Sequence, residues 1–256
     1  MVLSACFYPY YNETIPEKKE ACAMTFVPFA AAHWAALLVC AAVCLSLIVF
    51  RGPLRSPRRG RFAAVSLALL MAMLEAGLYY TYTIRGEWSV WTLPFELCTI
   101  TLWLSTVMLL TRSRILYQIL FYLGTLGALQ AMLTPDLDET FPSFHYFHFF
   151  LGHTGILAAS VYMTAVERMR PTLRSLPIAV LALHIAAIPG GIVNRLAGTN
   201  YMFLARKPEG GSLLDWLGPW PWYIVELEPI VWLMCLLLYG LVTGADRLSK
   251  AKEKRG

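Results

Sequence analysis

The sequence predicts an all-α, polytopic membrane protein with about seven transmembrane helices, and its composition and hydrophobic pattern lead to this fold class. The chain has 256 residues, of which 58% are hydrophobic and 14% are charged. Its mean hydropathy of +0.57 is typical of membrane proteins and not of soluble domains. Apolar runs of about 18 residues or more recur along the chain, and each is long enough to cross a bilayer as a helix.

Seven spans are expected, separated by polar connections. They cover residues 27–50, 62–82, 92–111, 115–133, 147–166, 176–193 and 223–243. We expect a single membrane domain over residues 1–256, in which an external N-terminal segment, 1–26, precedes the seven-helix bundle, 27–243, and a basic tail, 244–256, follows it. The start of the chain lacks the pattern of a cleavable signal peptide, so the first span is expected to act as an uncleaved signal anchor.

The basic residues predict how the bundle is oriented. Fifteen of the 21 lysines and arginines lie on one set of alternate connections, which includes residues 51–61 and the C-terminal tail. Cytoplasmic loops carry such an excess, so the C-terminus is expected in the cytoplasm and the N-terminus outside, in a multi-pass protein of the cell membrane. Basic residues that flank membrane helices are the common reason for a net charge such as this chain's +5. We therefore expect membrane lipids as partners, and no nucleic acid.

Small residues and a proline predict local features of the later spans. Gly124, Gly127 and Gly155 each have an alanine four residues later, a spacing that allows close contacts between helices. Pro189, which two glycines follow, is expected to break or kink the sixth span, and a broken helix at membrane depth needs protein or a wet cavity around it. Residues 194–204 would then continue as a second half-helix or fold back.

Ten polar residues lie in the outer half of the predicted spans, whereas the inner half is nearly bare. They are His33, Glu75, Glu96, Cys98, Gln130, His153, His184, Asn194, Glu226 and Glu228. Ionisable residues inside a membrane usually face the bundle interior or a wet cavity. We therefore expect a polar chamber that opens outward, and the alternative is a structural network that ties the helices together.

Cys98 is the candidate nucleophile of this chamber. Pro94 is expected in the first turn of the third span, which places the thiol within about one turn of the helix N-terminus, where the helix dipole favours a thiolate. His153 is the leading candidate for the activating base and His184 the second, since cysteine and histidine commonly form such a pair. Glu96 lies about 200° from Cys98 around the helix, too far for a direct pair. An inert, packed cysteine is the alternative.

No metal or cofactor is expected. His145, His148 and His153 spread around too wide an arc of a helix to hold one ion. The chain has no Cys-x2-Cys motif and no other spacing typical of a zinc site. No lysine lies in any span, which excludes a retinal Schiff base. Cys6 and Cys22, before the first span, are candidates for a disulfide in an oxidising exterior.

Several motifs, from the third span onward, resemble those of a known family. They are Leu93-Pro94-Phe95-Glu96-Leu97-Cys98, Thr134-Pro135-Asp136, the phenylalanine-rich run to His153, Tyr162-Met163-Thr164, Arg170-Pro171-Thr172, Asn200-Tyr201-Met202-Phe203-Leu204 and Gly218-Pro219-Trp220-Pro221-Trp222-Tyr223. The chain resembles the YwaF-like bacterial integral membrane proteins, which are distantly similar to the eukaryotic transmembrane protein 164 acyltransferase group. The resemblance implies a cysteine-dependent enzyme that remodels phospholipids, with Cys98 as the acyl-accepting nucleophile and His153 as its base.

The leading hypothesis is a membrane acyltransferase or lipase-like, lipid-remodelling enzyme in which Cys98 takes an acyl chain from a phospholipid or lysophospholipid substrate and His153 moves the proton. Its site would be supported by Glu75, Glu96, His184, Asn200 and Glu226, with Asn200 or backbone amides stabilising the oxyanion. The alternative is a small-solute transporter or ligand-sensing module in which Glu75, His184 and Glu226 carry protons. A third hypothesis is a purely structural membrane scaffold.

Overall fold

The described part of the chain folds into helices joined by loops. The computed structural model describes residues 26–137, 139–208 and 213–253. In these ranges the α-helices are α1 (Ala31–Val49), α2 (Arg51–Leu54), α3 (Pro57–Arg85), α4 (Leu97–Thr111), α5 (Arg114–Leu120), α6 (Leu123–Leu133), α7 (Phe144–Ala165), α8 (Ser175–Ala197) and α9 (Trp222–Glu253). Two 3-10 turns, η2 (Tyr201–Phe203) and η3 (Leu213–Trp216), lie between α8 and α9. Cys6 and Cys22, with their predicted disulfide, lie outside the described residues.

Five helical segments are long and apolar enough to cross a membrane, as a multi-pass membrane protein requires. They are α1, α3, the consecutive helices α5 and α6 taken together, α8, and α9 as far as Ala245. The apolar helix α4 has only 15 residues. α7 has 22 residues and carries three histidines in its first half. Each of the seven predicted spans thus has a helical counterpart. However, α4 is too short and α7 is too polar to count among the five segments that are long and apolar enough to cross a membrane.

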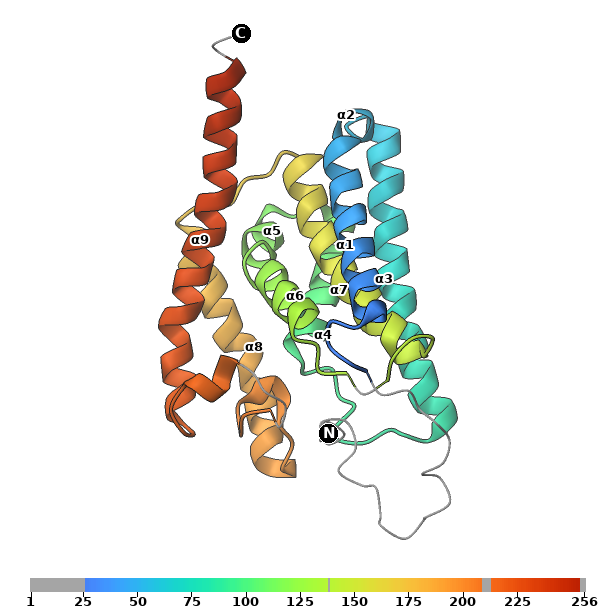
Figure 1. The fold of residues 1–256 in the computed structure, drawn as a ribbon, viewed down its shortest axis with the longest axis vertical. Helices are drawn as coiled ribbons and strands as arrows, with labels where there is room; N and C mark the ends of the chain where they lie inside the picture. Colours follow the sequence, from blue (N-terminus) through green and yellow to red (C-terminus); the bar gives the residue numbers. More distant parts are fainter. Residues whose placement is uncertain (1–25, 138, 209–212, 254–256) are drawn as a thin grey trace.

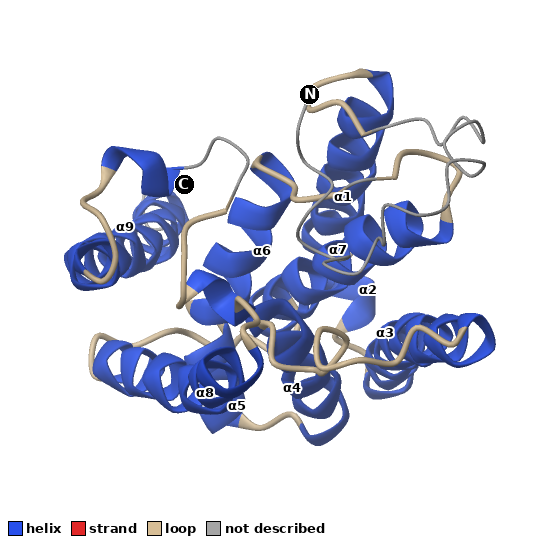
Figure 2. Ribbon diagram, turned by 90° about the horizontal axis from the view of Figure 1, so that it is seen from below, coloured by secondary structure: helices blue, strands red, loops and turns tan. Residues whose placement is uncertain are grey.

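α7 lies at the centre of the helix bundle. It packs against α1, α3, α4 and α6, and Figure 2 shows these helices around it. The contact with α3 is especially close, because a Cβ atom placed on Gly155 would lie 2.8 Å from Cγ of Met71. The small residues predicted for helix contacts therefore let α3 approach α7. This approach is needed to bring the polar side chains of the two helices together.

α9 lies at one side of the molecule, next to α8 (Figure 1). Val225, Leu233 and Leu237 on this helix are exposed. In a membrane such apolar side chains face lipid. This exposure has no free-energy cost, because lipid tails are as apolar as the side chains. Figure 1 also places α2 and the C-terminal end of α9 at one end of the molecule, opposite to the loops that precede α4, α7 and α9.

The structure corrects the predicted helix ends in two places. α4 begins at Leu97, so Pro94 lies in the preceding loop and not in the first turn. Ser89 and Thr92 form a hydrogen-bonded turn there, which holds the segment out of the helix. The predicted fourth span is divided into α5 and α6 around Phe121 and Tyr122, where the Tyr122 N–H bonds to the Ile119 carbonyl in a tighter, 3-10-type turn.

The predicted break at Pro189 is wrong. α8 continues through this proline to Ala197, because a proline removes one backbone donor and a long helix has enough other bonds to continue. The helix ends at Gly198, which has a φ of 72°. A glycine adopts this left-handed conformation without a steric penalty. The chain then folds back into η2, which contacts α8. Of the two alternatives predicted for residues 194–204, a second half-helix or a fold-back, the structure has the fold-back.

The close contact between α3 and α7 predicts that two glycine-to-alanine substitutions have different effects on the melting temperature. Gly155→Ala should lower the melting temperature of the purified protein in detergent, because overpacking costs about 1–3 kcal/mol. Gly127→Ala is the control, since its Cβ would lie 3.8 Å from the nearest atom, Cδ2 of Leu97. That variant should be as stable as the wild type or more so, because alanine favours the helix. Equal melting temperatures for the two variants would contradict this packing.

Candidate functional site

A small cavity between α3, α4 and α7 gathers a carboxylate, a thiol and two imidazoles. It has a volume of about 40 Å³, and we call it the Cys98 cavity. Its lining consists of Glu75, Cys98, Thr99, Leu102, His148, Gly152, His153 and Ile156. A volume of about 10–15 Å³ on this scale already holds one water molecule. The cavity therefore has room for a small reacting group, but not for a whole lipid or solute.

Glu75 enters the cavity from the middle of α3 and is almost completely buried, with 1% of its surface exposed. Its Oε1 lies 3.0 Å from Nε2 of His148 on α7. Its Oε2 is buried and has no hydrogen-bond partner. A buried carboxylate is costly unless it is paired. The contact with His148 stabilises one of the two carboxylate oxygens.

His153 lines the same cavity and has one ring nitrogen without a hydrogen-bond partner. Its Nδ1 lies 2.6 Å from the carbonyl oxygen of Phe149, one turn earlier in α7. A carbonyl only accepts hydrogen bonds, so we assign the proton of the neutral ring to Nδ1. Nε2 then carries a lone pair, and it is buried without a hydrogen-bond partner. His153 therefore has the tautomer that a general base requires.

Cys98 is the second residue of α4, within the first helical turn. The backbone N–H groups of Leu97, Cys98 and Thr99 have no acceptor within the helix, because the first turn always leaves such donors free. Glu96, at the N-cap, makes no capping hydrogen bond with its side chain. The partial positive charge of this helix end favours an anion at Cys98 or directly beside it.

The start of α4 is held in place by the segment that follows α8. The Tyr201 hydroxyl accepts a hydrogen bond from Leu93 N at 2.9 Å and donates one to Val90 O at 2.7 Å. Burial raises the pKa of Tyr201 to about 12, so the phenol keeps its donor proton at neutral pH. Asn194, at the end of α8, bonds both backbone groups of Tyr201. These contacts fix where the helix that carries Cys98 begins.

Four of the predicted supporting residues lie outside the lining of the Cys98 cavity. Glu96 Oε2 accepts a hydrogen bond from Met202 N at 3.3 Å. The Asn200 side chain bonds the backbone of residues 205 and 206. Glu226 Oε2 accepts from Gly218 N at 2.7 Å, and His184 Nε2 lies 3.4 Å from Glu228 Oε2. Each of these side chains ties loops or helices together, and only Glu75 among the five supporting residues reaches the cavity.

The predicted polar tier is therefore divided between a site and a network of structural contacts. Glu75, Cys98 and His153 line the cavity. His33, by contrast, accepts a hydrogen bond from Phe29 N and contacts the Met132 carbonyl at 2.8 Å, which links α1 to α6. The residues of the tier thus differ in their contacts, since some line the Cys98 cavity and others tie helices together.

His148 is the member of the site that the sequence did not predict. It lies in the second turn of α7, which begins at Phe144, three residues before the predicted start of the span. Its helical spacing was the available signal, because His148, Gly152 and Ile156 follow one another every four residues and all line the cavity. His145 points elsewhere and lies 3.3 Å from Glu139 Oε2. No group of three or more metal-ligating side chains occurs among the described residues.

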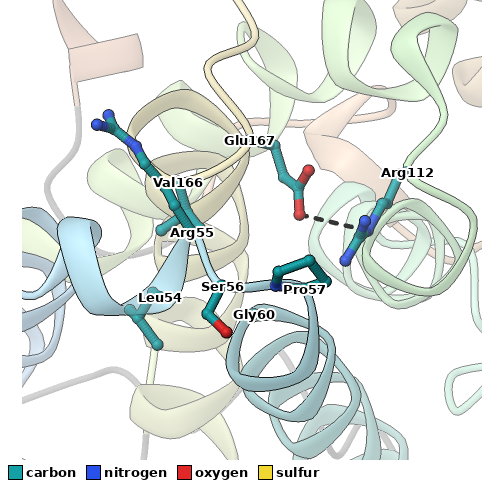
Figure 3. Close-up of a pocket in the computed structure, with 8 residues that line it drawn as sticks. All are labelled: Leu54, Arg55, Ser56, Pro57, Gly60, Arg112, Val166 and Glu167. Atoms are coloured by element: carbon teal, nitrogen blue, oxygen red, sulfur yellow. Dashed lines mark ion pairs between the residues drawn. The ribbon is translucent and has the colours of Figure 1, made fainter.

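A second cavity, of about 110 Å³, lies where α3 begins and α4 and α7 end (Figure 3). Arg112 and Glu167 form an ion pair of 3.3 Å beside it. Glu167 also accepts a hydrogen bond from Tyr162, and Arg55 donates to the Ala165 carbonyl. These charged groups join three helix ends to one another. No thiol or imidazole lines this cavity, so the Cys98 cavity is the better candidate for chemistry.

The comparisons with known proteins give one family model and one related protein that match most of the chain. Residues 28–239 match the sequence model of the TMEM164 family. Over 217 residues the chain is 30% identical to an uncharacterized protein of Treponema pallidum (strain Nichols), and this match covers 84% of the chain and 89% of the relative. No solved structure matches the chain.

Asn194→Ala should loosen the segment that holds the start of α4. The variant loses hydrogen bonds to both backbone groups of Tyr201 and to the Thr199 hydroxyl, and each buried group left without a partner costs about 1–3 kcal/mol. We expect a lower melting temperature and faster proteolysis within residues 198–208. Gln130→Ala is the control, since Gln130 bonds only Thr134, four residues away. Unchanged proteolysis of the Asn194 variant would refute this role.

Proposed function

The chain belongs to the TMEM164 family, and on this premise we propose that it is a membrane enzyme that transfers acyl chains from phospholipids through Cys98. One observation carries the proposal: Cys98 of α4 and His153 of α7 line the same buried cavity. A thiol beside an imidazole whose Nε2 is free to take a proton is a common arrangement for nucleophilic catalysis.

The proposed first step acylates the cysteine. His153 Nε2 takes the proton of the Cys98 thiol, and the thiolate attacks the carbonyl carbon of a phospholipid ester. As the ester C–O bond breaks, the protonated imidazole returns its proton to the leaving alcohol oxygen. The products are a lysophospholipid and a thioester between the acyl chain and Cys98, and His153 is neutral again.

The negative oxygen that forms during this attack needs hydrogen-bond donors. The first-turn N–H groups of Cys98 and Thr99 are the best placed, since they belong to the nucleophile itself and to the next residue. We propose these backbone amides for the oxyanion, and not Asn200, whose side chain is engaged by residues 205 and 206. No side chain has to move to supply the two donors.

The small volume of the cavity favours this chemistry over solute transport. About 40 Å³ accommodates an ester carbonyl at the sulfur but leaves little room for a bound solute. Glu226 and His184, two of the three expected proton carriers, hold the local contacts described above. Membrane lipids are therefore the proposed substrates. Within the TMEM164 family, we also propose that the chain groups with the YwaF-like bacterial proteins.

Replacing either member of the proposed pair should abolish acylation of the enzyme. We expect Cys98→Ala to prevent covalent labelling by an activated acyl ester, and His153→Asn to slow it roughly 10²- to 10⁴-fold, the usual contribution of a general base. Intact-protein mass spectrometry of the protein in detergent measures the added acyl mass. Cys235→Ala is the control, because Cys235 is a buried thiol of α9 outside the cavity. Labelling that persists in Cys98→Ala would exclude this mechanism.

We also propose that the Cys98 cavity lies in the outer half of a cell-membrane protein with a cytoplasmic C-terminus. Support comes from the basic residues and from the common position of α2 and the C-terminal end of α9 (Figure 1). A green fluorescent protein fused after Gly256 should fluoresce in a bacterial host, because it folds only in the cytoplasm, whereas alkaline phosphatase at the same point should be inactive. The reverse pair of results would invert the topology.

A further inference from the structure

Three stretches near the C-terminal end of α7 are rich in arginine. They are residues 50–61, 112–114 and 166–174, and together they contain ten arginines, no lysine and one carboxylate, that of Glu167. Cytoplasmic loops are enriched in lysine and arginine alike, and the tail after Gly244 does contain lysines. The orientation of the chain therefore gives no reason for arginine alone. Arginine differs from lysine in its planar fork of donors, which matches the oxygens of a phosphate group.

Arginines from two of these stretches converge on the last turn of α7. Arg55 donates a hydrogen bond to the Ala165 carbonyl at 2.9 Å, and Arg170 donates one to the neighbouring Thr164 carbonyl. Cations at a helix C-terminus satisfy its free carbonyls, so these two contacts have a structural reason. Arg51 and Arg168 lack such a reason, because in the part of the chain that the structure describes neither side chain makes a hydrogen bond or an ion pair.

The positive charges of these side chains act on one another. Desolvation and neighbouring positive charges both lower the pKa of the Arg55 guanidinium. The neighbours are Arg168, Arg51 and Arg170, and we call these four residues the arginine cluster. Like charges that lie together repel one another, and an anion among them removes this repulsion. The donors of Arg51 and Arg168 are available to such an anion.

Glu167 does not neutralise the arginine cluster. Its Oε1 lies 3.3 Å from Nε of Arg112 and accepts a hydrogen bond from the Tyr162 hydroxyl. Figure 3 shows this ion pair beside the cavity of about 110 Å³, with the Arg55 guanidinium directed away from Arg112. A ligand of the cluster therefore binds on the surface next to this cavity, and not inside it.

We propose that the arginine cluster binds the phosphate group of an anionic phospholipid at the membrane surface. Phe50, which directly precedes Arg51, and Phe62, in the second turn of α3, are exposed. A lipid can cover such apolar side chains with its acyl chains while its phosphate contacts the guanidinium groups. A soluble phosphate compound gains only the second contact. A zwitterionic headgroup brings an ammonium group to the arginines, which repel it.

This lipid is distinct from the proposed substrate. Arg55 bonds Ala165, which follows His153 by twelve residues on α7, and twelve residues of helix span about 18 Å. The esters of a phospholipid lie close to its phosphate, so a lipid held at the cluster keeps them away from the Cys98 cavity. The inference therefore does not depend on the acylation of Cys98.

The test compares lipids on the full chain, purified in a neutral detergent. Native mass spectrometry measures the binding of dioleoylphosphatidylglycerol and dioleoylphosphatidylcholine, which share their acyl chains and differ in the headgroup. Glycerophosphoglycerol, the anionic headgroup without acyl chains, is added as a competitor. We expect the wild type to bind phosphatidylglycerol roughly tenfold more tightly than phosphatidylcholine. An equal concentration of the competitor should displace little of the bound lipid.

Arg51→Gln combined with Arg168→Gln should weaken the binding of phosphatidylglycerol roughly ten- to thirtyfold, because each basic residue near an anionic headgroup favours binding about fivefold. The binding of phosphatidylcholine should not change. Arg58→Gln combined with Arg59→Gln is the matched control. These two arginines are also exposed and belong to the same stretch, 50–61, but they lie outside the cluster. The control removes the same charge and should bind phosphatidylglycerol as the wild type does.

Equal weakening by the two double variants would show a general attraction of surface charge and overturn the proposal. Equal binding of the two lipids would overturn it as well. Displacement by the competitor at equal concentration would identify a soluble phosphate compound as the ligand, against the lipid proposed here. Without lipid, both double variants should melt as the wild type does, because the described residues receive no hydrogen bond from the replaced side chains. If a double variant is less stable, Arg168→Gln is compared with Arg58→Gln, and only the first should bind about fivefold more weakly.

Discussion

The hydrogen bond between Glu75 and His148 is the contact on which the arrangement of the central helices depends. A carboxylate in the interior of an apolar bundle must find a partner, because its desolvation costs several kcal/mol. The partner lies on α7, so the contact fixes how α3 and α7 are rotated and shifted against each other. Gly155 permits the approach by leaving room for Met71. The same rotation turns His153, five residues further along α7, toward the Cys98 cavity.

The position of the thiol depends on a different part of the chain. α4 starts at Leu97 because the segment before it is held by Tyr201, which is held in turn by Asn194 at the end of α8. The nucleophile therefore lies in the first turn, where free backbone donors and the helix dipole coincide. The sequence predicts a helix from Thr92 with Pro94 in its first turn, and the observed start at Leu97 places Cys98 closer to the helix N-terminus than that prediction does.

The helices can be predicted from the sequence because hydrophobic length is a property of single segments. Cys98 and His153 can be singled out as candidates because their residue types are rare at membrane depth. Prediction from the sequence fails where a feature depends on contacts between distant segments. Pro189 reads as a break, but α8 passes through it. His148 reads as an interfacial residue until the start of α7 and the proximity of Glu75 are known. Depth along a span can be read from sequence, whereas the partner on another helix cannot.

The cavity is so small that the reacting atoms of a lipid substrate would bind inside it and the rest of the lipid outside it. About 40 Å³ holds the reacting atoms of an ester and its attacker but no acyl chain. Under the proposed function, the chain and the headgroup of a phospholipid must therefore lie outside the cavity, where lipid tails cover the exposed apolar faces of the helices without cost. Selectivity among acyl chains would then be weak within the cavity.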